Sequence, residues 1–165
     1  MGMQDIILTI INVILAIFSG LGAYKSVKYF RKSKNLTSFA QTNKALVEVQ
    51  KMLMELPEAL SASNSSRRGK KGLSLHNTLC DIGQELNTNL NEINSNIPAD
   101  YSDKIRQLQN KDNFNLQTCI NSYISGDAVK DNGIDSEDFN ACQARLLEIQ
   151  DYLKKAALET EEKLK

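Results

Sequence analysis

The chain has no tryptophan, and among its 165 residues there are only 2 prolines, 3 cysteines and 1 histidine. The cysteines, Cys80, Cys119 and Cys142, are odd in number and form no CxxC pair, so we expect reduced, buried thiols and neither a disulfide framework nor a zinc site. No Walker loop or nucleophile elbow is present, and candidate bases are few. We therefore expect a protein that is not an enzyme and that uses no cofactor and no metal.

Charge of either sign is absent from residues 6–24, which are followed by five basic residues, Lys25, Lys28, Arg31, Lys32 and Lys34. At about 1.5 Å per residue this uncharged run is roughly 28 Å long, close to the thickness of a bilayer's hydrocarbon core. The positive-inside bias places the chain after the basic stretch in the cytoplasm. A cleaved signal peptide is the alternative, but it carries its positive charge before the apolar core. The sequence thus predicts a single-pass anchor in the inner (cytoplasmic) membrane, with the N-terminus outside.

The zero net charge hides an asymmetry between the two parts of the chain. Residues 1–72 contain 11 basic and 4 acidic residues, and residues 73–165 contain 9 basic and 16 acidic residues. Positive charge is concentrated beside the predicted span and around residues 67–71. The residues outside the span are polar enough to be soluble. We expect two parts, a transmembrane anchor with a basic juxtamembrane stretch over residues 1–34 and a cytoplasmic α-helical domain over residues 35–165.

Helical periodicity dominates residues 35–165. A heptad seam, typical of a short coiled coil or a bundle helix, consists of Phe39, Leu46, Leu53 and Leu60, with Val49 and Leu56 between them and Thr42 as its one weak position. Further helices are expected from Ser74 to just before Pro98, over residues 102–108 and 115–125, and after a cap at Asp135 or Ser136. Residues 127–138 are acidic, but Ala128 and Lys130 stand where a calcium loop needs oxygen ligands, so a turn is expected there. No strand is predicted, and the fold class is all-α: one N-terminal transmembrane helix followed by a small helical bundle.

The connection between the first two helices of that domain holds four cations, Arg67, Arg68, Lys70 and Lys71, with glycines among them. Guanidinium and ammonium groups bind phosphate oxygens, and glycine lets backbone N–H groups approach an anion. The alternatives are a solvated loop without a ligand and a patch that touches anionic lipid. His76, one turn into the following helix, adds a donor or a stacking surface, or is an ordinary exposed histidine.

Self-association is suggested by the predicted span itself. Ala16 and Gly20 stand four residues apart, as do Ser19 and Ala23, and small residues at this spacing allow close contact between helices in lipid. Asn12 lies near the middle of the span, where it needs a polar partner that a second copy would supply. We expect a homo-oligomer, with a tetramer as one arrangement.

This layout of one N-terminal span, a basic juxtamembrane stretch and a small helical cytoplasmic domain resembles the small membrane-bound effectors of type III CRISPR immunity. The resemblance lies in architecture and length and covers the whole chain. It implies that the cytoplasmic domain binds a cyclic oligoadenylate messenger and that binding perturbs or permeabilises the lipid bilayer in antiviral defence. The chemistry of the basic connection suggests Arg67, Arg68, Lys70, Lys71 and His76 as the residues that bind such a ligand. Two alternatives stay open: a structural membrane tether that docks a partner protein, and a holin-like or toxin pore that needs no ligand.

Overall fold

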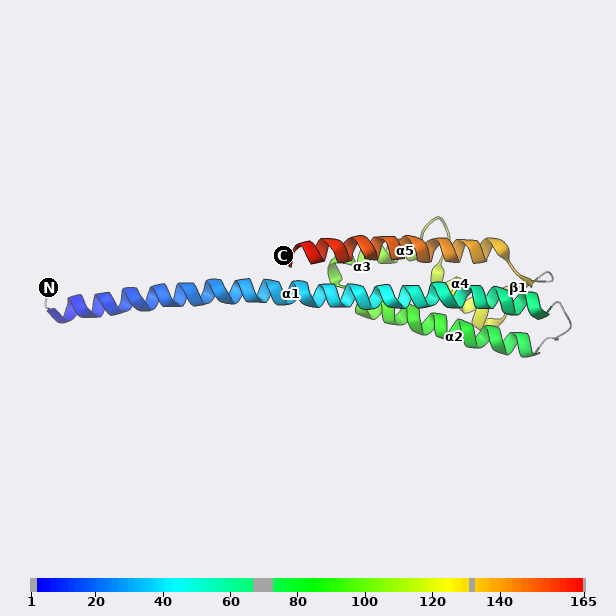
Figure 1. The fold of residues 1–165 in the computed structure, drawn as a ribbon, viewed down its shortest axis with the longest axis horizontal. Helices are drawn as coiled ribbons and strands as arrows, with labels where there is room; N and C mark the ends of the chain where they lie inside the picture. Colours follow the sequence, from blue (N-terminus) through cyan, green and yellow to red (C-terminus); the bar gives the residue numbers. More distant parts are fainter. Residues whose placement is uncertain (1–2, 67–72, 131–132, 165) are drawn as a thin grey trace.

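The computed structural model describes the backbone of residues 3–66, 73–130 and 133–164, and the side chains of residues 12–13, 15–62, 75–129 and 134–164. The described chain is built from helices α1 (Met3–Ser66), α2 (Leu73–Asn96), α3 (Ala99–Gln109), α4 (Leu116–Ser125) and α5 (Ser136–Glu162). The predicted all-α fold is confirmed. Helix α1 is 64 residues long; its N-terminal half projects alone, and its C-terminal half forms part of the bundle (Figure 1).

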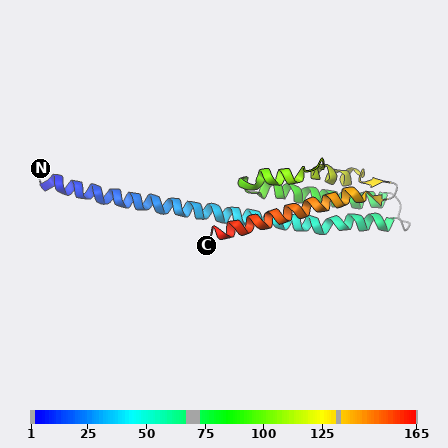
Figure 2. The same cartoon turned by 90° about the horizontal axis from the view of Figure 1, so that it is seen from above.

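Helices α2 and α5 lie along the C-terminal half of α1, and both run in the direction opposite to it (Figures 1 and 2). Helix α4 packs on α2, and α3 packs on α5. Helix α5 ends beside the middle of α1, where the side-chain amide of Asn35 donates a hydrogen bond of 3.4 Å to the carbonyl oxygen of Lys163. The bundle therefore begins about halfway along α1.

The buried stripe of α1 differs from the predicted heptad seam. Its fully buried residues are Thr42, Ala45, Val49, Met52, Leu56 and Ala59. The predicted seam residues Phe39, Leu46, Leu53 and Leu60 are only partly buried. The reason is that α1 packs against two helices, so the middle of its buried face lies between the two lines of contact, where the small Ala45 and Ala59 permit close approach. Thr42, predicted to be the weak position, is buried with its hydroxyl donating to the Ser38 carbonyl at 2.8 Å.

Helix boundaries follow local capping chemistry. Helix α4 begins after Asn115, whose side chain accepts from the Thr118 N–H at 2.7 Å, and it ends at Gly126, which has a φ of 87°. Asp135 caps α5 by accepting from the Glu137 N–H at 2.9 Å, as predicted. Helix α3 begins at Ala99, directly after Pro98 and not at 102 as predicted, because a proline is compatible with the start of a helix.

One small antiparallel pair of strands contradicts the prediction of no strand. Strand β1 (Val129–Lys130) pairs with β2 (Gly133–Ile134), with Val129 opposite Ile134. Strands of two residues are too short to give an alternating pattern in the sequence. The pair turns the chain from α4 into α5, and it places Ala128 and Ile134 in the core.

The predicted transmembrane helix over residues 6–24 is not supported by the fold. In the part of the chain that the structure describes, no helix is both long enough and apolar enough to cross a membrane. The side chains of residues 6–11 and 14, which belong to the predicted span, lie outside the described residues.

Candidate functional site

The projecting half of α1 carries a surface of apolar and aromatic side chains that no other element covers. Each of its large apolar or aromatic side chains that the structure describes exposes more than half of its surface; they are Val13, Leu15, Ile17, Phe18, Leu21, Tyr24, Val27, Tyr29 and Phe30. Contiguous apolar surface of this extent is typical of a region that contacts lipid or another protein. We call residues 12–24 of α1, which precede the first cation, the apolar shaft.

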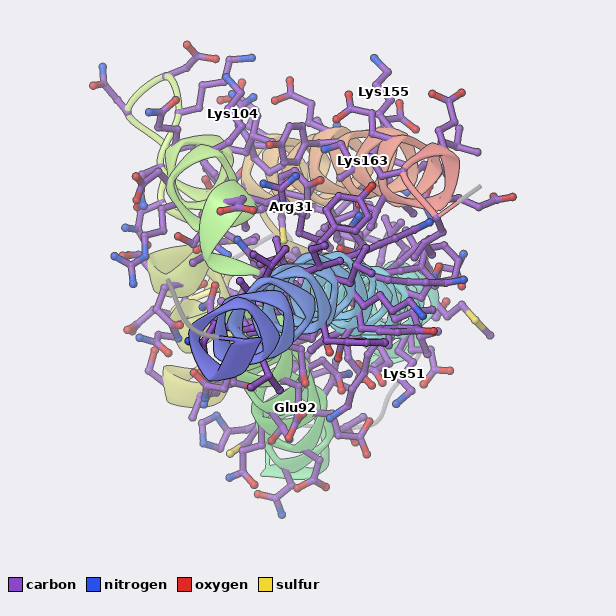
Figure 3. The ribbon with its side chains drawn as sticks, turned by 90° about the vertical axis from the view of Figure 1, so that its left-hand side faces the viewer. Arg31, Lys51, Glu92, Lys104, Lys155 and Lys163 are labelled. Atoms are coloured by element: carbon purple, nitrogen blue, oxygen red, sulfur yellow. The ribbon has the colours of Figure 1, made fainter. Side chains whose placement is uncertain are left out.

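A groove lies where the apolar shaft meets the bundle. It has a volume of about 560 Å³ and lies between α1 and the end of α5. Its lining consists of Tyr24, Val27, Lys28, Arg31, Lys32, Asn35, Lys163 and Leu164. Figure 3, a view from the N-terminal side, labels Arg31 between α1 and α5 and Lys163 on α5, with Lys104 and Lys155 farther from α1. We call this the basic groove, since four of its side chains are cations and none is acidic.

The four cations of the basic groove are electrostatically uncompensated. Among the described residues, Lys28, Arg31, Lys32 and Lys163 take part in no ion pair. The next cation along α1, Lys34, lies 3.9 Å from Asp100 and lines a neighbouring hollow of about 370 Å³ against the start of α3. An uncompensated cluster of this kind attracts anions, and Arg31 can bind a phosphate through two parallel N–H groups.

Contacts between α3 and α5 hold the end of α5 in place. The rings of Tyr101 and Tyr152 meet edge to face with centroids 6.1 Å apart. The Tyr101 and Thr160 hydroxyls share a hydrogen bond of 3.2 Å, and the Thr160 hydroxyl also donates to the Ala156 carbonyl at 2.7 Å. Because Thr160 lies less than one helical turn before Lys163, these contacts fix the position at which Lys163 reaches the groove.

The site residues predicted from the sequence do not form this groove. Arg67, Arg68, Lys70 and Lys71 lie outside the described residues. His76 is exposed near the start of α2, and a Cβ built on Gly126 would lie 2.8 Å from its Nδ1 atom. His76 therefore packs against the C-terminal end of α4. That position is at the end of the bundle farthest from the N-terminus (Figure 1).

The sequence gives no sign that Lys163 and Asn35 belong to a binding groove. The cations at 28, 31 and 32 stand out as a basic stretch, but Lys163 lies in a mixed run of glutamates and lysines with nothing to distinguish it. Only the packing of α5 on α1 brings it beside them.

Buried ionisable groups elsewhere have structural roles. Burial raises the pKa of the Tyr123 hydroxyl, and a hydrogen bond with Cys119 together with burial raises the pKa of the Cys142 thiol, so both groups stay protonated. Cys119 and Cys142 are buried as predicted, whereas Cys80 is only partly buried; all three are free. Within the described ranges, no group of three or more histidine, cysteine or acidic side chains could hold a metal ion.

Surface ion pairs shift the pKa of two acidic residues on the bundle. The pKa of Glu92 is lowered by hydrogen bonds, first from Lys44 at 3.2 Å. The pKa of Glu148 is lowered by hydrogen bonds from Lys111 and Arg145. The Lys44–Glu92 pair joins α1 to α2, and the Lys111–Glu148 pair joins the turn after α3 to α5.

Comparison of the chain with protein-family models, with curated proteins and with solved structures gave no match.

Proposed function

We propose that the chain is a single-span, homo-oligomeric membrane effector, in which the N-terminal part of α1 crosses the bilayer and the bundle lies in the cytoplasm. The observation that carries the proposal is the continuity of α1, one helix of 64 residues whose described large apolar side chains between residues 13 and 30 are exposed and whose second half is the central element of the bundle. Further support comes from the order of features along it, since the apolar shaft is followed directly by the basic groove.

Continuity of α1 also supports an effector rather than a passive anchor. A helix transmits rotation and translation along its axis, so a change in how α1 packs against α2 and α5 would reach the apolar shaft directly. A tether has no need of such rigid coupling and functions with a flexible linker. In addition, α2 and α5 bury their apolar faces against α1, and these are the faces that a tether would offer to a partner.

The ligand of this effector remains the cyclic oligoadenylate implied by the resemblance. Helix α1 ends at Ser66 and α2, which bears His76, begins at Leu73. Ser66 lies 42 helical positions after Tyr24, which corresponds to roughly 60 Å along the axis. We propose that binding at this distal end alters the packing of α1, and that α1 carries the change to the membrane.

Oligomerisation in this proposal occurs through the apolar shaft. A Cβ at Gly20 or Gly22 would meet no atom within 4 Å, so this small-residue face is open in the single chain. The heptad side of α1 is already covered by α2 and α5 of the same chain. Contacts between copies would therefore form along the shaft, with Asn12 hydrogen-bonding to its counterpart.

Membrane integration is tested by alkaline carbonate extraction of membranes from cells that express the full chain. We expect the wild-type chain to stay with the membrane and the Phe18→Lys variant to be extracted, because a charge in the middle of the span is costly. Met54→Lys is the matched control, since Met54 is 74% exposed on the bundle. Extraction of the wild type would exclude the span.

Orientation is tested separately by cysteine labelling in a background in which Cys80, Cys119 and Cys142 are replaced by alanine. A membrane-impermeant thiol reagent added to intact cells should label a cysteine at Gln4 and should label one at Ser63 only after lysis. The reverse pattern would place the bundle outside.

Messenger binding is tested by calorimetry of the full chain in detergent against cyclic and linear oligoadenylates. The double variant Arg67→Ala, Arg68→Ala should lose affinity and the salt dependence of binding, because a phosphate site gains from counterion release. The control is Lys154→Ala, which removes an exposed cation of α5 that pairs with Asp151. Absence of binding to every oligoadenylate by the wild type would remove the sensor function while leaving membrane integration intact.

A further inference from the structure

We propose that the basic groove binds the phosphodiester headgroup of an anionic phospholipid, with Lys163 of α5 completing a site that the juxtamembrane segment begins. This inference rests on the proposed function, because it needs the apolar shaft to lie in the bilayer. It goes beyond a general attraction between basic residues and a negative surface, because it assigns a defined role to a residue at the far end of the chain.

The spacing of the cations suits one phosphate group. Lys28, Arg31 and Lys32 are related by three and four positions, so they project from one face of α1. The Asn35–Lys163 hydrogen bond brings the end of α5 to the next turn of that face. Arg31 supplies a planar fork for two phosphate oxygens, and the lysines supply point charges around it. The cavity of about 560 Å³ is large enough for a lipid headgroup.

The depth of the groove agrees with the position of a headgroup. Taking Tyr24 as the edge of the hydrocarbon core, Lys28 lies about 6 Å and Asn35 about 16 Å farther along α1. The polar layer of a bilayer occupies roughly the first 5 to 8 Å beyond the core. The part of the groove near Lys28 therefore lies within this layer, and the part near Asn35 faces the adjoining water. The backbone of Lys163 lies at the depth of Asn35, and its long side chain lines the groove. Tyr24, at the rim, is a residue type that favours this interface.

The lining of the groove also selects between headgroups. No acidic side chain lines it, so it offers no partner for the ammonium group of a zwitterionic lipid. Val27, less than one turn after Tyr24, provides apolar surface in the part of the groove nearest the bilayer, which a lipid can contact and inorganic phosphate cannot. The chemistry thus favours a lipid with one net negative charge, such as phosphatidylglycerol, over both phosphatidylcholine and free phosphate.

The test is lipid retention by the full chain in non-ionic detergent, measured by native mass spectrometry during titration with phosphatidylglycerol. The variant Lys163→Gln should weaken retention about fivefold, and Arg31→Gln by at least as much, which is the effect expected for loss of one cation near an anionic headgroup. The matched control is Lys155→Gln, an exposed lysine of the same helix that lies outside the groove (Figure 3). It removes the same charge and should leave retention unchanged.

Three results would overturn the inference. The first is that Lys163→Gln and Lys155→Gln retain phosphatidylglycerol equally well. The second is that the wild-type chain retains phosphatidylcholine as well as phosphatidylglycerol. The third is that inorganic phosphate at an equal concentration displaces the bound lipid. Circular dichroism of each variant checks that the helices are intact. Carbonate-resistant integration of the same preparations into pure phosphatidylcholine vesicles tests the span separately. A chain that integrates but does not retain phosphatidylglycerol selectively would disprove the lipid site alone, whereas a chain that fails to integrate would disprove the proposed function.

Discussion

Gly83 of α2 lies directly against Ile124 of α4. A Cβ built on Gly83 would lie 2.8 Å from the Cγ1 atom and 2.9 Å from the backbone nitrogen of Ile124. In the sequence, Gly83 is only a mild weakness in a long amphipathic helix. In the fold the two helices come so close at Gly83 that an alanine there would require the backbone of α4 to move.

The first prediction concerns this contact. Gly83→Ala should lower the free energy of unfolding by about 1–2 kcal/mol, because the cost of overpacking exceeds the gain in helix propensity. The measurement is urea denaturation of the full chain followed by circular dichroism. The control is Met54→Ala, at an exposed position of the bundle. A stabilised Gly83→Ala variant would show that α2 and α4 are not packed this closely.

The second prediction tests the position of the buried stripe on α1. Leu56→Ala should cost about 2–5 kcal/mol of stability, since Leu56 is fully buried and its truncation leaves a cavity. Leu53→Ala should cost clearly less, because Leu53 is only partly buried at the edge of the core. Met54→Ala, at an exposed position between them, serves as the control. A larger loss for Leu53→Ala than for Leu56→Ala would show that the centre of the buried face passes through the line of Phe39, Leu46, Leu53 and Leu60.

The third prediction concerns the Tyr123 hydroxyl, which is buried and has no hydrogen-bond partner among the described residues. Tyr123→Phe should raise stability by about 1 kcal/mol, because it removes a polar group that folding desolvates without compensation. Tyr101→Phe is the matched comparison, and it should lower stability by about 1 kcal/mol because it removes the hydrogen bond with Thr160. Thermal unfolding of both variants gives the comparison. A destabilised Tyr123→Phe variant would indicate that the hydroxyl is hydrogen-bonded after all.

The fourth prediction concerns pH. Burial raises the pKa of Glu55, and the charge of Glu85 adds to this, although Asn89 opposes it by donating to both carboxylate oxygens at 3.1 and 2.9 Å. The folded state then holds its proton more tightly than the unfolded state does, so the contribution of Glu55 to stability is present at low pH and is lost as pH rises through the folded pKa. Relative to wild type, Glu55→Gln should therefore gain stability as pH rises from about 4 to 7.

Glu92→Gln provides the opposite control. Hydrogen bonds, first from Lys44, lower the pKa of Glu92, so its contribution to stability is present at neutral pH and is lost as pH falls through the folded pKa. Compared with wild type, this variant should be less stable at neutral pH, with a difference that shrinks on acidification. Urea midpoints measured over the same pH series give both trends. Parallel trends for the two variants would rule out opposite pKa shifts.

Much of the secondary structure could be predicted because its signals are local. The predicted helix over residues 115–125 matches α4 to within one residue, with Asn115 as its cap, and Asp135, one of the two predicted caps, begins α5; each of these signals acts within one turn of the chain. The β1–β2 pair was not predicted, since its two-residue strands are defined by pairing and not by periodicity. The start of α3 was placed too late because Pro98 ends one helix and also precedes the next.

The candidate site was predictable only in part. The basic residues of α1 are adjacent in the chain, so composition alone identifies them, together with the uncharged stretch before them. The four cations after Ser66 were also identified, but they lie outside the described residues. The contact of His76 with Gly126 could not be predicted from the sequence, because the two residues are 50 positions apart, one in α2 and the other at the end of α4.

By itself, then, the sequence determined the all-helical class, the helix caps and the order of apolar and basic segments along α1, because each depends on side chains within a few turns of one another. Only the tertiary structure decided which face of α1 is buried, since that face is set by two helices that pack on it from distant parts of the chain. It also decided that Lys163 joins the basic groove and that Gly83 must lack a side chain. These last features depend on distances between segments far apart in sequence, and local patterning carries no information about such distances.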